Sequence, residues 1–308
     1  MKPGMRLTLL DDSGEKFFGE GPCRLLKAVE QSGSLRAAAA SMEMAYSKAM
    51  KLLKTAEATL GFPLIHRTTG GKSGGGSTLT PEGKRFIRQY EAYRDACMAE
   101  NQRLFRQHFP RTGCVIMASG LGTRFGGNKL MADFLGEPMI LRSISATEGL
   151  FDRRVVVTRH ESVAALCRER NVDVILHDLP HRNDTVRLGL EALGDVDCCL
   201  FCPGDQPLLR QETVARLLEN WNHSRDSIFR PVFEDTPGSP VLFPAWTFPE
   251  LLTLPEGKGG GFVLRNHPEA VCTVPIATPF ELSDADTPEI LEILKNLDKE
   301  SEHDQSAF

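Results

Sequence analysis

A glycine-rich segment in the middle of the chain has the residue types of a phosphate-binding loop. An apolar stretch at 114–118 runs directly into Ser119-Gly120-Leu121-Gly122-Thr123-Arg124-Phe125-Gly126-Gly127-Asn128-Lys129. Glycines let a backbone approach an anion closely, and consecutive backbone N–H groups form a cradle for it. Arg124 and Lys129 add two cations beside that cradle, which suits a triphosphate. The residues we expect to bind a nucleotide here are Ala118, Ser119, Gly120, Leu121 and Gly122.

The glycine spacing separates this loop from other nucleotide-binding loops. It is Gly-x-Gly-x-x-x-Gly, whereas the dinucleotide fingerprint is Gly-x-Gly-x-x-Gly, so a Rossmann-type cofactor is disfavoured. A second glycine cluster, Gly70-Gly71-Lys72-Ser73, resembles the end of a P-loop. That motif needs a glycine where this chain has His66, and the cluster falls between two short expected strands. We therefore reject a P-loop.

A candidate metal ligand follows another apolar strand. Cys198-Cys199-Leu200-Phe201 leads into Cys202-Pro203-Gly204-Asp205-Gln206-Pro207. An aspartate held by glycine and proline at the carboxyl end of a strand is placed to coordinate Mg²⁺ beside phosphates, although an ordinary turn aspartate is the alternative. The spacing Cys199-x-x-Cys202 would also fit zinc or a redox pair. We reject that interpretation because strand alternation puts the two thiols on opposite faces.

The phosphate loop and Asp205 need a sheet whose strands end at one edge, and the second part of the chain predicts one. Strands are expected at 114–118, 154–158, 172–177, 197–202, 227–233 and 271–276. Helices are expected near 138–149, 161–170, 184–193, 210–221 and 286–297. This βαβ series is typical of an α/β, Rossmann-like fold with a mostly parallel sheet between two helical layers. Ligands of such sheets bind at the carboxyl ends of the strands.

Length and charge divide the chain in two. Its 308 residues are twice a single-domain length of roughly 150. Residues 1–110 hold 17 Lys and Arg against 11 Asp and Glu, a net charge of +6, while the whole chain carries −5 and the remainder therefore −11. We expect a DNA-binding domain at 1–110 and a second domain with a separate function at 111–308. Eight scattered cysteines, no secretory signal and no apolar run of about 18 residues predict a cytoplasmic protein without a membrane span.

The first domain is expected to be a winged helix-turn-helix. Helices are predicted at 22–31, 35–40 and 46–60, and two short strands near 63–69 and 77–80 would form the wing. Helix-turn-helix proteins place their recognition helix in the major groove, here the lysine-bearing helix 46–60. A three-helix bundle whose lysines are merely solvated is the alternative. The residues that we expect to contact DNA are Tyr46, Ser47, Lys48, Lys51 and, in the wing, Lys72.

A long helix is expected to follow the wing. Thr80-Pro81-Glu82-Gly83 begins it, with proline at its first position, and it runs to about Phe109. Its apolar stripe consists of Phe86, Tyr90, Tyr93, Cys97, Leu104 and Phe105. So small a domain offers this stripe little to pack on, and pairing with a second chain would bury it. We expect a homodimer, with packing onto the second domain as the alternative.

The second domain resembles the nucleotidyltransferases of molybdenum cofactor maturation. Ordered blocks carry the resemblance across about 113–297: Ala118–Leu130, Gly136–Met139, Asn183–Leu190, Gly204–Leu208, Gly238–Phe243 and Asp284–Pro288. The resemblance implies a Rossmann-like domain that joins a nucleotide to the phosphate of molybdopterin and releases pyrophosphate. Arg124, Lys129 and Asp205 are then the expected catalytic residues, with Mg²⁺ on Asp205.

Within this resemblance, the block Asp284-Ala285-Asp286-Thr287-Pro288 is similar to the cytidylyltransferase branch, so we expect CTP as substrate. Ala118-Ser119-Gly120 matches neither the cytidylyl nor the guanylyl branch. Asp284 is the expected second metal ligand, and Asp286 is the competing choice. Asn183 is expected to read the base or ribose, unless it only caps a helix.

The acceptor side is assigned to two further segments. Gly238-Ser239-Pro240 and the glycine loop Gly257-Lys258-Gly259-Gly260-Gly261 are expected to line the pterin side. The glycine loop could equally be a surface turn. A guanylyl or sugar-phosphate nucleotidyltransferase remains the alternative substrate class, and a molybdoenzyme apoprotein is a further expected partner.

The first domain resembles the winged-helix domain of the molybdate-responsive repressor and, more distantly, the LysR-type regulators. The matching blocks are Gly33–Ala39, Tyr46–Ala49, Phe62–Arg67 and Leu79–Gly83. The resemblance implies DNA binding as a dimer. We expect an enzyme that also represses transcription. Two alternatives are a regulator whose transferase domain has become a ligand sensor, and an enzyme whose winged helix only dimerises it.

Overall fold

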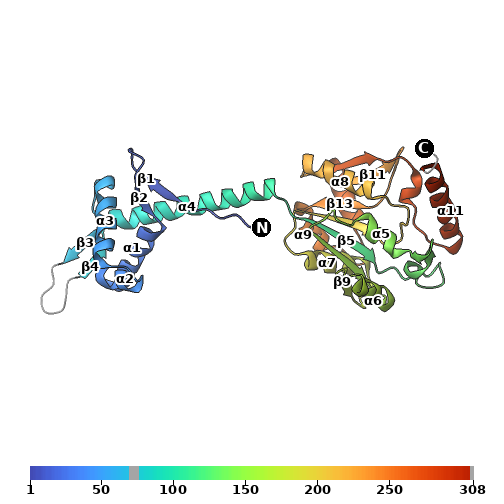
Figure 1. Ribbon diagram of the computed structural model, residues 1–308, viewed down its shortest axis with the longest axis horizontal. Coiled ribbons are helices and arrows are strands. Elements are labelled where there is room, and N and C mark those ends of the chain that lie inside the picture. Colours follow the sequence, from blue (N-terminus) through green and yellow to red (C-terminus); the bar gives the residue numbers. More distant parts are fainter. Residues whose placement is uncertain (69–75, 306–308) are drawn as a thin grey trace. The chain divides into compact units, whose positions relative to one another are not determined.

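The structure is a computed structural model that describes residues 1–68 and 76–305, with side chains as far as residue 300. The chain folds into two compact units that divide between Phe109 and Pro110 (Figure 1). Unit 1 is the N-terminal part and unit 2 the C-terminal part, and each is described by itself. No helix within the described ranges is both long and apolar enough to cross a membrane.

Unit 1 is a helical domain with small hairpins. Its elements are β1 (Thr8–Leu10), β2 (Lys16–Gly19), α1 (Glu20–Ser32), α2 (Leu35–Ser41), α3 (Tyr46–Leu60), β3 (Ile65–Thr68), β4 (Gly76–Leu79) and α4 (Pro81–His108). The predicted helices and the β3–β4 hairpin are confirmed. The antiparallel pair β1–β2 was not predicted, because strands of three and four residues carry too short a hydrophobic pattern.

Small side chains set the spacing of the two helices of the helix-turn-helix. Ser34 caps α2, since its hydroxyl accepts a hydrogen bond from the backbone N–H of Ala37 at 3.4 Å. Ala38 and Ala39 of α2 are fully buried, as is Ala49 of α3. Side chains of this size let the two helices approach closely, which explains the alanine-rich sequence of α2.

Helix α4 begins at a well-defined cap, and its last buried residue, Tyr90, lies about a third of the way along its length. The hydroxyl of Thr80 accepts a hydrogen bond from the backbone N–H of Gly83 at 2.8 Å, and Pro81 occupies the first turn. Tyr90 is buried against Phe18. Beyond it, several large apolar side chains are exposed: Tyr93, Met98, Leu104 and Phe109. Phe86 and Tyr90 of the predicted stripe therefore belong to the core of unit 1, and the rest of the stripe, from Tyr93 on, is exposed or half-buried.

Unit 2 is built on a mixed sheet. Its strands are β5 (Thr112–Ala118), β8 (Arg153–Thr158), β9 (Val174–Leu176), β10 (Cys198–Pro203), β11 (Ile228–Phe233), β12 (Thr236–Pro237), β13 (Val241–Pro244) and β14 (Val271–Pro275), and β6 (Asp133–Phe134) pairs separately with β7 (Glu137–Pro138). The order is β12-β11-β13-β10-β5-β8-β9, with β14 beside β11. Strands β10, β5, β8 and β9 run parallel, as predicted. The unpredicted β13 is antiparallel to β10 and β11, so the sheet is less uniformly parallel than expected.

Helices cover both faces of this sheet, which confirms the three-layer α/β fold (Figure 1). One face packs against α5 (Ile140–Ala146), α6 (Glu161–Glu169), α8 (Gln211–His223) and α11 (Pro288–Gln305). The other packs against α7 (Arg182–Leu193), α9 (Phe248–Leu252) and α10 (Gly261–Asn266). A strand covered on both faces is apolar throughout, and Cys198 to Cys202 of β10 is buried at every position.

The cysteines behave as small buried hydrophobes. None of the eight forms a disulfide, and Cys97 and Cys272 alone are not fully buried. Cys199 packs in the core on one face of the sheet and Cys202 in the core on the other. The rejection of a zinc or redox site at these two thiols is thereby supported. Burial raises the pKa of Cys199 and Cys202 well above its ordinary value, which keeps both in the thiol form.

Candidate nucleotide site

The glycine loop leaves the end of β5 with its backbone amides unengaged. The N–H groups of Gly120, Leu121, Gly122 and Thr123 have no acceptor among the residues that the structure describes. Gly122 has a positive φ of 61°, and a Cβ there would collide with the carbonyl oxygen of Gly127. Only glycine fits that conformation. The loop therefore presents a run of free donors, the arrangement that binds a phosphate chain.

Lys129 links this loop to Asp205, the predicted metal ligand. Its ammonium lies 2.6 Å from Oδ2 of Asp205 and 2.8 Å from Oδ1 of Asp286. The Lys129 side chain is only 9% exposed. Burial opposes its charge, but the hydrogen bonds to the two carboxylates outweigh that effect and raise the pKa of Lys129. Lys129 is therefore a fixed cation between the loop and the carboxylates.

Asp205 is positioned by the close approach of two neighbouring strands. The backbone N–H of Gly204 donates to the carbonyl of Met117 on β5 at 3.0 Å, and a Cβ at Gly204 would lie 2.7 Å from Ile140 Cδ1. Glycine thus lets the turn after β10 sit against the end of β5. The structure brings Asp205 and the glycine loop to the same sheet edge.

Asp284 and Asp286 differ in their surroundings. Asp286 faces Lys129 and also Arg124, whose exposed guanidinium lies 3.5 Å away. The hydrogen bond from Lys129 lowers the pKa of Asp286. Asp284 accepts a hydrogen bond from Gln206 Nε2 at 2.9 Å. Burial, and secondly the charge of Asp205, raise the pKa of Asp284.

The residues beside Asp284 suit a hard cation. Asp205 and Asp284 are carboxylates close enough to repel each other, and Oε1 of Gln206 is buried without a hydrogen-bond partner. Oxygen donors of this kind are the preferred ligands of Mg²⁺, which takes one or two carboxylates and completes its shell with water and phosphate. No group of three or more His, Cys, Asp or Glu side chains in the described chain could hold a metal by itself. A protein site of two carboxylates fits Mg²⁺ bound together with a triphosphate.

Replacing Asp284 and replacing Asp286 by asparagine should have opposite effects on the stability of the fold. Asp284→Asn should raise the melting temperature at pH 7 by a few degrees, on the order of 2–4 °C for each kcal/mol, because it removes a carboxylate whose ionisation the fold disfavours. Because the fold raises the pKa of Asp284, this gain is absent below pH 3.8, the pKa of the carboxyl in the unfolded chain, and it develops as the pH rises. Asp286→Asn should lower the melting temperature at pH 7, and that loss should fade in acid. Thermal melts of the magnesium-free protein from pH 3.5 to 8 test both, and equal shifts in the two variants would contradict the assignment.

Two histidines support the loop and were not predicted from the sequence. Nε2 of His160, just after β8, lies 2.8 Å from the carbonyl oxygen of Gly120. Ser119 donates its hydroxyl to the carbonyl of Val157 at 3.0 Å and accepts from His177 Nε2 at 2.8 Å. Burial lowers the pKa of His177, which keeps it neutral. His160 follows β8, which pairs with β5, and His177 follows β9, the next strand of the sheet, so the rule that strand ends meet at one edge could have pointed to both.

Asn183 lies in the first turn of α7 and is not its cap. His181 is the N-cap, in a capping box with Asp184. Oδ1 of Asn183 accepts a hydrogen bond from the backbone N–H of Gly257 at 3.0 Å, and His181 lies 2.8 Å from Glu256. Asn183 thus holds the predicted acceptor loop 257–261 against α7. Its amide nitrogen makes no hydrogen bond to any residue that the structure describes.

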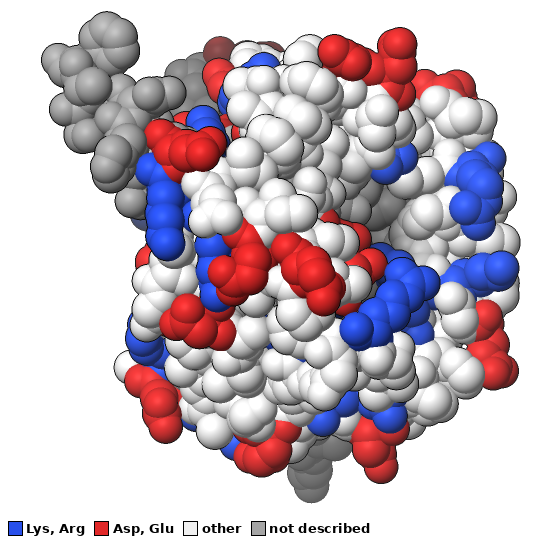
Figure 2. Space-filling view, turned by 90° about the vertical axis from the view of Figure 1, so that its right-hand side faces the viewer, with Lys and Arg blue, Asp and Glu red and all other residues white. Residues whose placement is uncertain are grey.

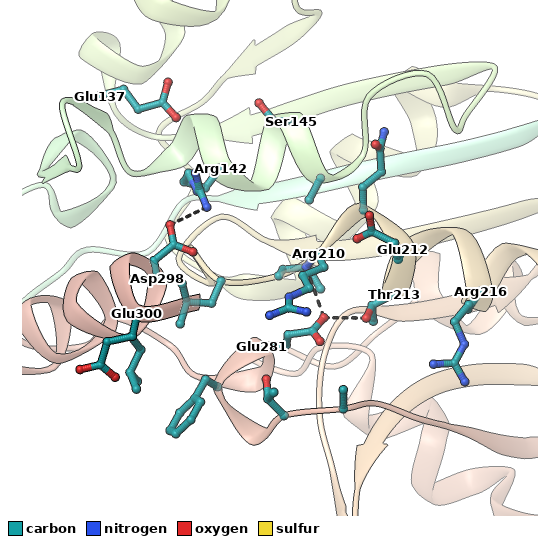
Figure 3. A pocket seen from close by; sticks show the side chains of 18 residues that line it. Glu137, Arg142, Ser145, Arg210, Glu212, Thr213, Arg216, Glu281, Asp298 and Glu300 are labelled. Atoms are coloured by element: carbon teal, nitrogen blue, oxygen red, sulfur yellow. Dashed lines mark hydrogen bonds and ion pairs between the residues drawn. The ribbon is translucent and has the colours of Figure 1, made fainter. Parts of the chain in front are cut away.

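A pocket of about 870 Å³ lies beside the start of α8, and neither the glycine loop nor Asp205, Asp284 or Asp286 lines it (Figure 3). Glu281, only 2% exposed, sits at its centre and accepts hydrogen bonds from Thr213 Oγ1 at 2.6 Å and from the backbone N–H of Arg210 at 3.3 Å. A carboxylate at this position caps the start of α8. Arg142 and Asp298 pair across the pocket at 2.9 Å (Figure 3). Glu281 precedes Asp284 by three residues, so this cap also anchors the segment that carries Asp284.

The candidate DNA-contacting residues of α3 are all exposed. Ser47, Lys48 and Lys51 point away from the side that buries Ala49, Leu53 and Ala56, and Tyr46 is exposed in the first turn of the helix. Arg36 of α2, which was not predicted, stacks over the ring of Tyr46 with 5.5 Å between its guanidinium carbon and the ring centroid. Lys72 lies outside the described residues. Figure 2 shows one face of the molecule, on which acidic and basic side chains are intermixed rather than separated into patches of one charge.

Two family models match the chain. The "MobA-like NTP transferase domain" matches residues 114–271, and "Bacterial regulatory helix-turn-helix protein, lysR family" matches residues 23–84. The transcriptional regulator ModE of Haemophilus influenzae is 38% identical over 75 residues, which are 24% of this chain and 29% of that protein. A probable molybdenum cofactor guanylyltransferase of Pyrococcus horikoshii is 30% identical over 111 residues, 36% of this chain and 56% of the relative.

The chain spans about a third of the length of the first curated relatives that it matches. Among solved structures, a nucleotidyl transferase from Methanothermobacter thermautotroptrophicus superposes with a TM-score of 0.53 at 20% identity. That match covers 60% of this chain and 96% of the other. At this identity the likeness establishes the fold of unit 2, an α/β nucleotidyltransferase sheet.

Proposed function

Because the chain belongs to the MobA-like NTP transferase domain family, we propose that unit 2 joins CMP from CTP to the phosphate of molybdopterin and releases pyrophosphate. The observation that carries the proposal is the position of Lys129, a buried cation that joins the free amides of the glycine loop to Asp205 and Asp286. A loop for phosphates, a fixed cation and paired carboxylates are the parts that nucleotidyl transfer requires.

The protein groups of the site act mainly by holding the substrates in position and by neutralising charge. The amides of Gly120 to Thr123 bind the β- and γ-phosphates, and Arg124 and Lys129 neutralise the charge that develops on the leaving pyrophosphate. The acceptor phosphate is already ionised, so no general base is needed. Ser119 is fixed by His177 and Val157, which orients the start of the loop toward the nucleoside.

Asp205 and Asp284 would hold Mg²⁺, while Asp286 positions Lys129 and Arg124. When bound, Mg²⁺ would neutralise phosphate charge and polarise the phosphate under attack. Asp286 is the weaker choice of ligand because it forms ion pairs with both Lys129 and Arg124, whereas Asp284 forms no ion pair with any residue that the structure describes.

CTP is favoured by the block Asp284–Pro288, which is similar to the cytidylyl branch. GTP is the second candidate, supported by the guanylyltransferase of Pyrococcus horikoshii. Turnover of the full chain with molybdenum-loaded molybdopterin and each nucleoside triphosphate, followed by pyrophosphate release, tests the choice. We expect CTP to give the highest kcat/KM. A preference for GTP would overturn the CTP assignment, and turnover only with a sugar phosphate would overturn the acceptor.

We further propose that unit 1 binds a pseudo-palindromic operator as a dimer, with α3 in the major groove and the exposed half of α4 in the dimer contact. The exposed face of α3 and the match to regulatory helix-turn-helix proteins support DNA binding. The exposed Tyr93, Leu104 and Phe109 support pairing of α4. A catalytically silent sensor is disfavoured by the intact set of Arg124, Lys129 and Asp205.

Lys48→Ala and Lys51→Ala should each weaken DNA binding by the full chain. Each lost phosphate contact should reduce the slope of log affinity against log salt concentration by about 0.9. Fluorescence anisotropy with duplexes from upstream of molybdoenzyme genes measures both effects. Lys27→Ala is the matched control, since that lysine belongs to α1 and is paired with Glu91 of α4. Equal affinity for these duplexes and for random DNA would mean that unit 1 only dimerises the enzyme.

A further inference from the structure

Arg36 is an exposed cation in the first turn of α2, where a positive charge does not stabilise the helix. The backbone N–H groups at a helix N-terminus carry partial positive charge, so a nearby cation is unfavourable. No acidic residue lies in this first turn. Arg36 has no ion pair or hydrogen bond with any residue that the structure describes. Helix stability and charge pairing in unit 1 therefore do not account for the charge of Arg36.

The contact that Arg36 does make is with the start of the recognition helix. Its guanidinium carbon lies 5.5 Å from the ring centroid of Tyr46, the first residue of α3. An aromatic face attracts a guanidinium and, unlike a carboxylate, takes none of its N–H donors. The stack therefore restricts the movement of Arg36 and leaves its hydrogen-bonding groups to solvent or to a bound molecule.

The position of Tyr46 on α3 suits it to hold Arg36. Tyr46 precedes the buried Ala49 by three residues, so the two lie on the same side of the helix. Ser47 and Lys51, four residues apart, share the side that points away from the core. The ring of Tyr46 therefore extends toward α2, away from the side that the proposed function places in the major groove.

The start of α2 is also joined to the wing. The backbone N–H of Ser77 in β4 donates to the carbonyl oxygen of Gly33 at 2.8 Å, in the turn that precedes α2. Through Arg36, the first turn of α2 contacts α3. The wing and α3 are the two parts of unit 1 that we expect to contact DNA, so Arg36 is held beside both.

Bound DNA would bring phosphates to this place. In helix-turn-helix complexes the N-terminal residues of the recognition helix contact base edges, while the preceding helix crosses the DNA backbone. Here the preceding helix is α2, and its one cation is stacked on the first residue of α3. A planar guanidinium can bind two phosphate oxygens at once.

We propose that Arg36 binds a phosphate of the DNA backbone, and that Tyr46 is a positioning residue whose ring holds this guanidinium and does not read a base edge. The sequence predicted Tyr46 as a DNA contact and missed Arg36, because the two side chains come from different helices. The inference rests on the proposed binding of DNA by unit 1.

Fluorescence anisotropy of the full chain tests the phosphate contact, with a duplex from upstream of a molybdoenzyme gene and a random duplex of equal length. Arg36→Gln should weaken binding to both by about 10-fold at a given salt concentration. It should also reduce the slope of log affinity against log salt concentration by about 0.9. Arg24→Gln is the matched control, since Arg24 is an exposed arginine of α1, one turn before Lys27, and should change neither quantity.

Two results would contradict the phosphate contact. Unchanged affinity and salt slope in Arg36→Gln, while the parent protein binds both duplexes, would overturn the proposal. A loss confined to the molybdoenzyme duplex would mean that Arg36 reads a base, which would also overturn it.

A double-mutant cycle tests the role of Tyr46. Tyr46→Ala should weaken binding and flatten its salt dependence as Arg36→Gln does. The double variant should lose about 10-fold in affinity, as each single variant does, and not about 100-fold. Tyr46→Phe keeps the ring and should restore most of the affinity that Tyr46→Ala loses. Additive losses would show that Tyr46 contacts DNA by itself and would overturn its positioning role.

Thermal melts separate this role from a structural one. Arg36→Gln should melt at or above the temperature of the parent protein, because it removes a cation from a helix N-terminus. A lower melting temperature together with weaker binding would assign Arg36 to the fold and overturn the proposal. Absence of binding to either duplex by the parent protein would refute the proposed function of unit 1 and this inference with it, whereas an unchanged variant of a binding parent refutes the inference alone.

Discussion

Asp205→Asn should reduce magnesium-dependent pyrophosphate release by about 1,000-fold, which corresponds to roughly 4 kcal/mol of transition-state stabilisation. Asparagine has the size of aspartate and can keep the turn after β10. It lacks the charge that draws Lys129 into place at 2.6 Å and that would bind the cation. The change should therefore appear mainly in kcat/KM for the nucleotide and in a higher magnesium requirement.

Asp226→Asn is the control for this substitution. That aspartate lies exposed in the turn before β11, so its loss removes the same charge from unit 2 without touching the site. Thermal melts of both variants show whether the fold is retained. A well-folded Asp205→Asn protein with activity close to that of Asp226→Asn would remove Asp205 from the proposed mechanism.

Gly122→Ala should lower kcat/KM for CTP by about 100-fold. An added Cβ would meet the carbonyl oxygen of Gly127 and would also occupy a left-handed conformation that L-residues rarely adopt. The loop would have to open, and the amides of Gly120 to Thr123 would no longer converge on the phosphates. Initial rates over a range of CTP concentrations measure the effect.

Gly127→Ala is the comparison for this second variant. A Cβ at Gly127 meets nothing within 4 Å, and the residue has no positive φ. Its activity should remain within about threefold of the parent protein. Similar losses in the two variants would mean that flexibility of the loop, rather than the conformation at Gly122, decides activity.

The parts of the site that the sequence predicted are those that depend on local chemistry. Glycines followed by Lys129, and Asp205 between glycine and proline, show their roles over a few residues. The supporting contacts of His160 and His177 depend on the order of β5, β8 and β9 in the sheet, and that order cannot be read from a single strand. The attachment of Gly257 to Asn183 joins residues 74 positions apart.

The same distinction explains the differences in the fold. The parallel strands β5, β8 and β10 are apolar runs with helices between them, so their number and direction could be predicted. Strand β13 has four residues, Val241–Pro244, and it is antiparallel because it returns from β11 through a short connection. For α4, the apolar spacing continues past Tyr90, although packing within unit 1 ends there. Periodicity shows that a stripe exists but not what covers each part of it.

The buried cysteines give each unit its own chemical reporter of opening. Cys23 is buried in unit 1, whereas Cys114, Cys167, Cys198, Cys199 and Cys202 are buried in unit 2. Burial raises the pKa of Cys23 and of Cys167 to about 11, so these thiols react slowly with alkylating reagents while the chain is folded. Opening of one unit exposes its own cysteines and leaves those of the other protected. The rate at which each peptide gains mass in an alkylation time course therefore measures the opening of the two units separately, in one sample and without a mutation.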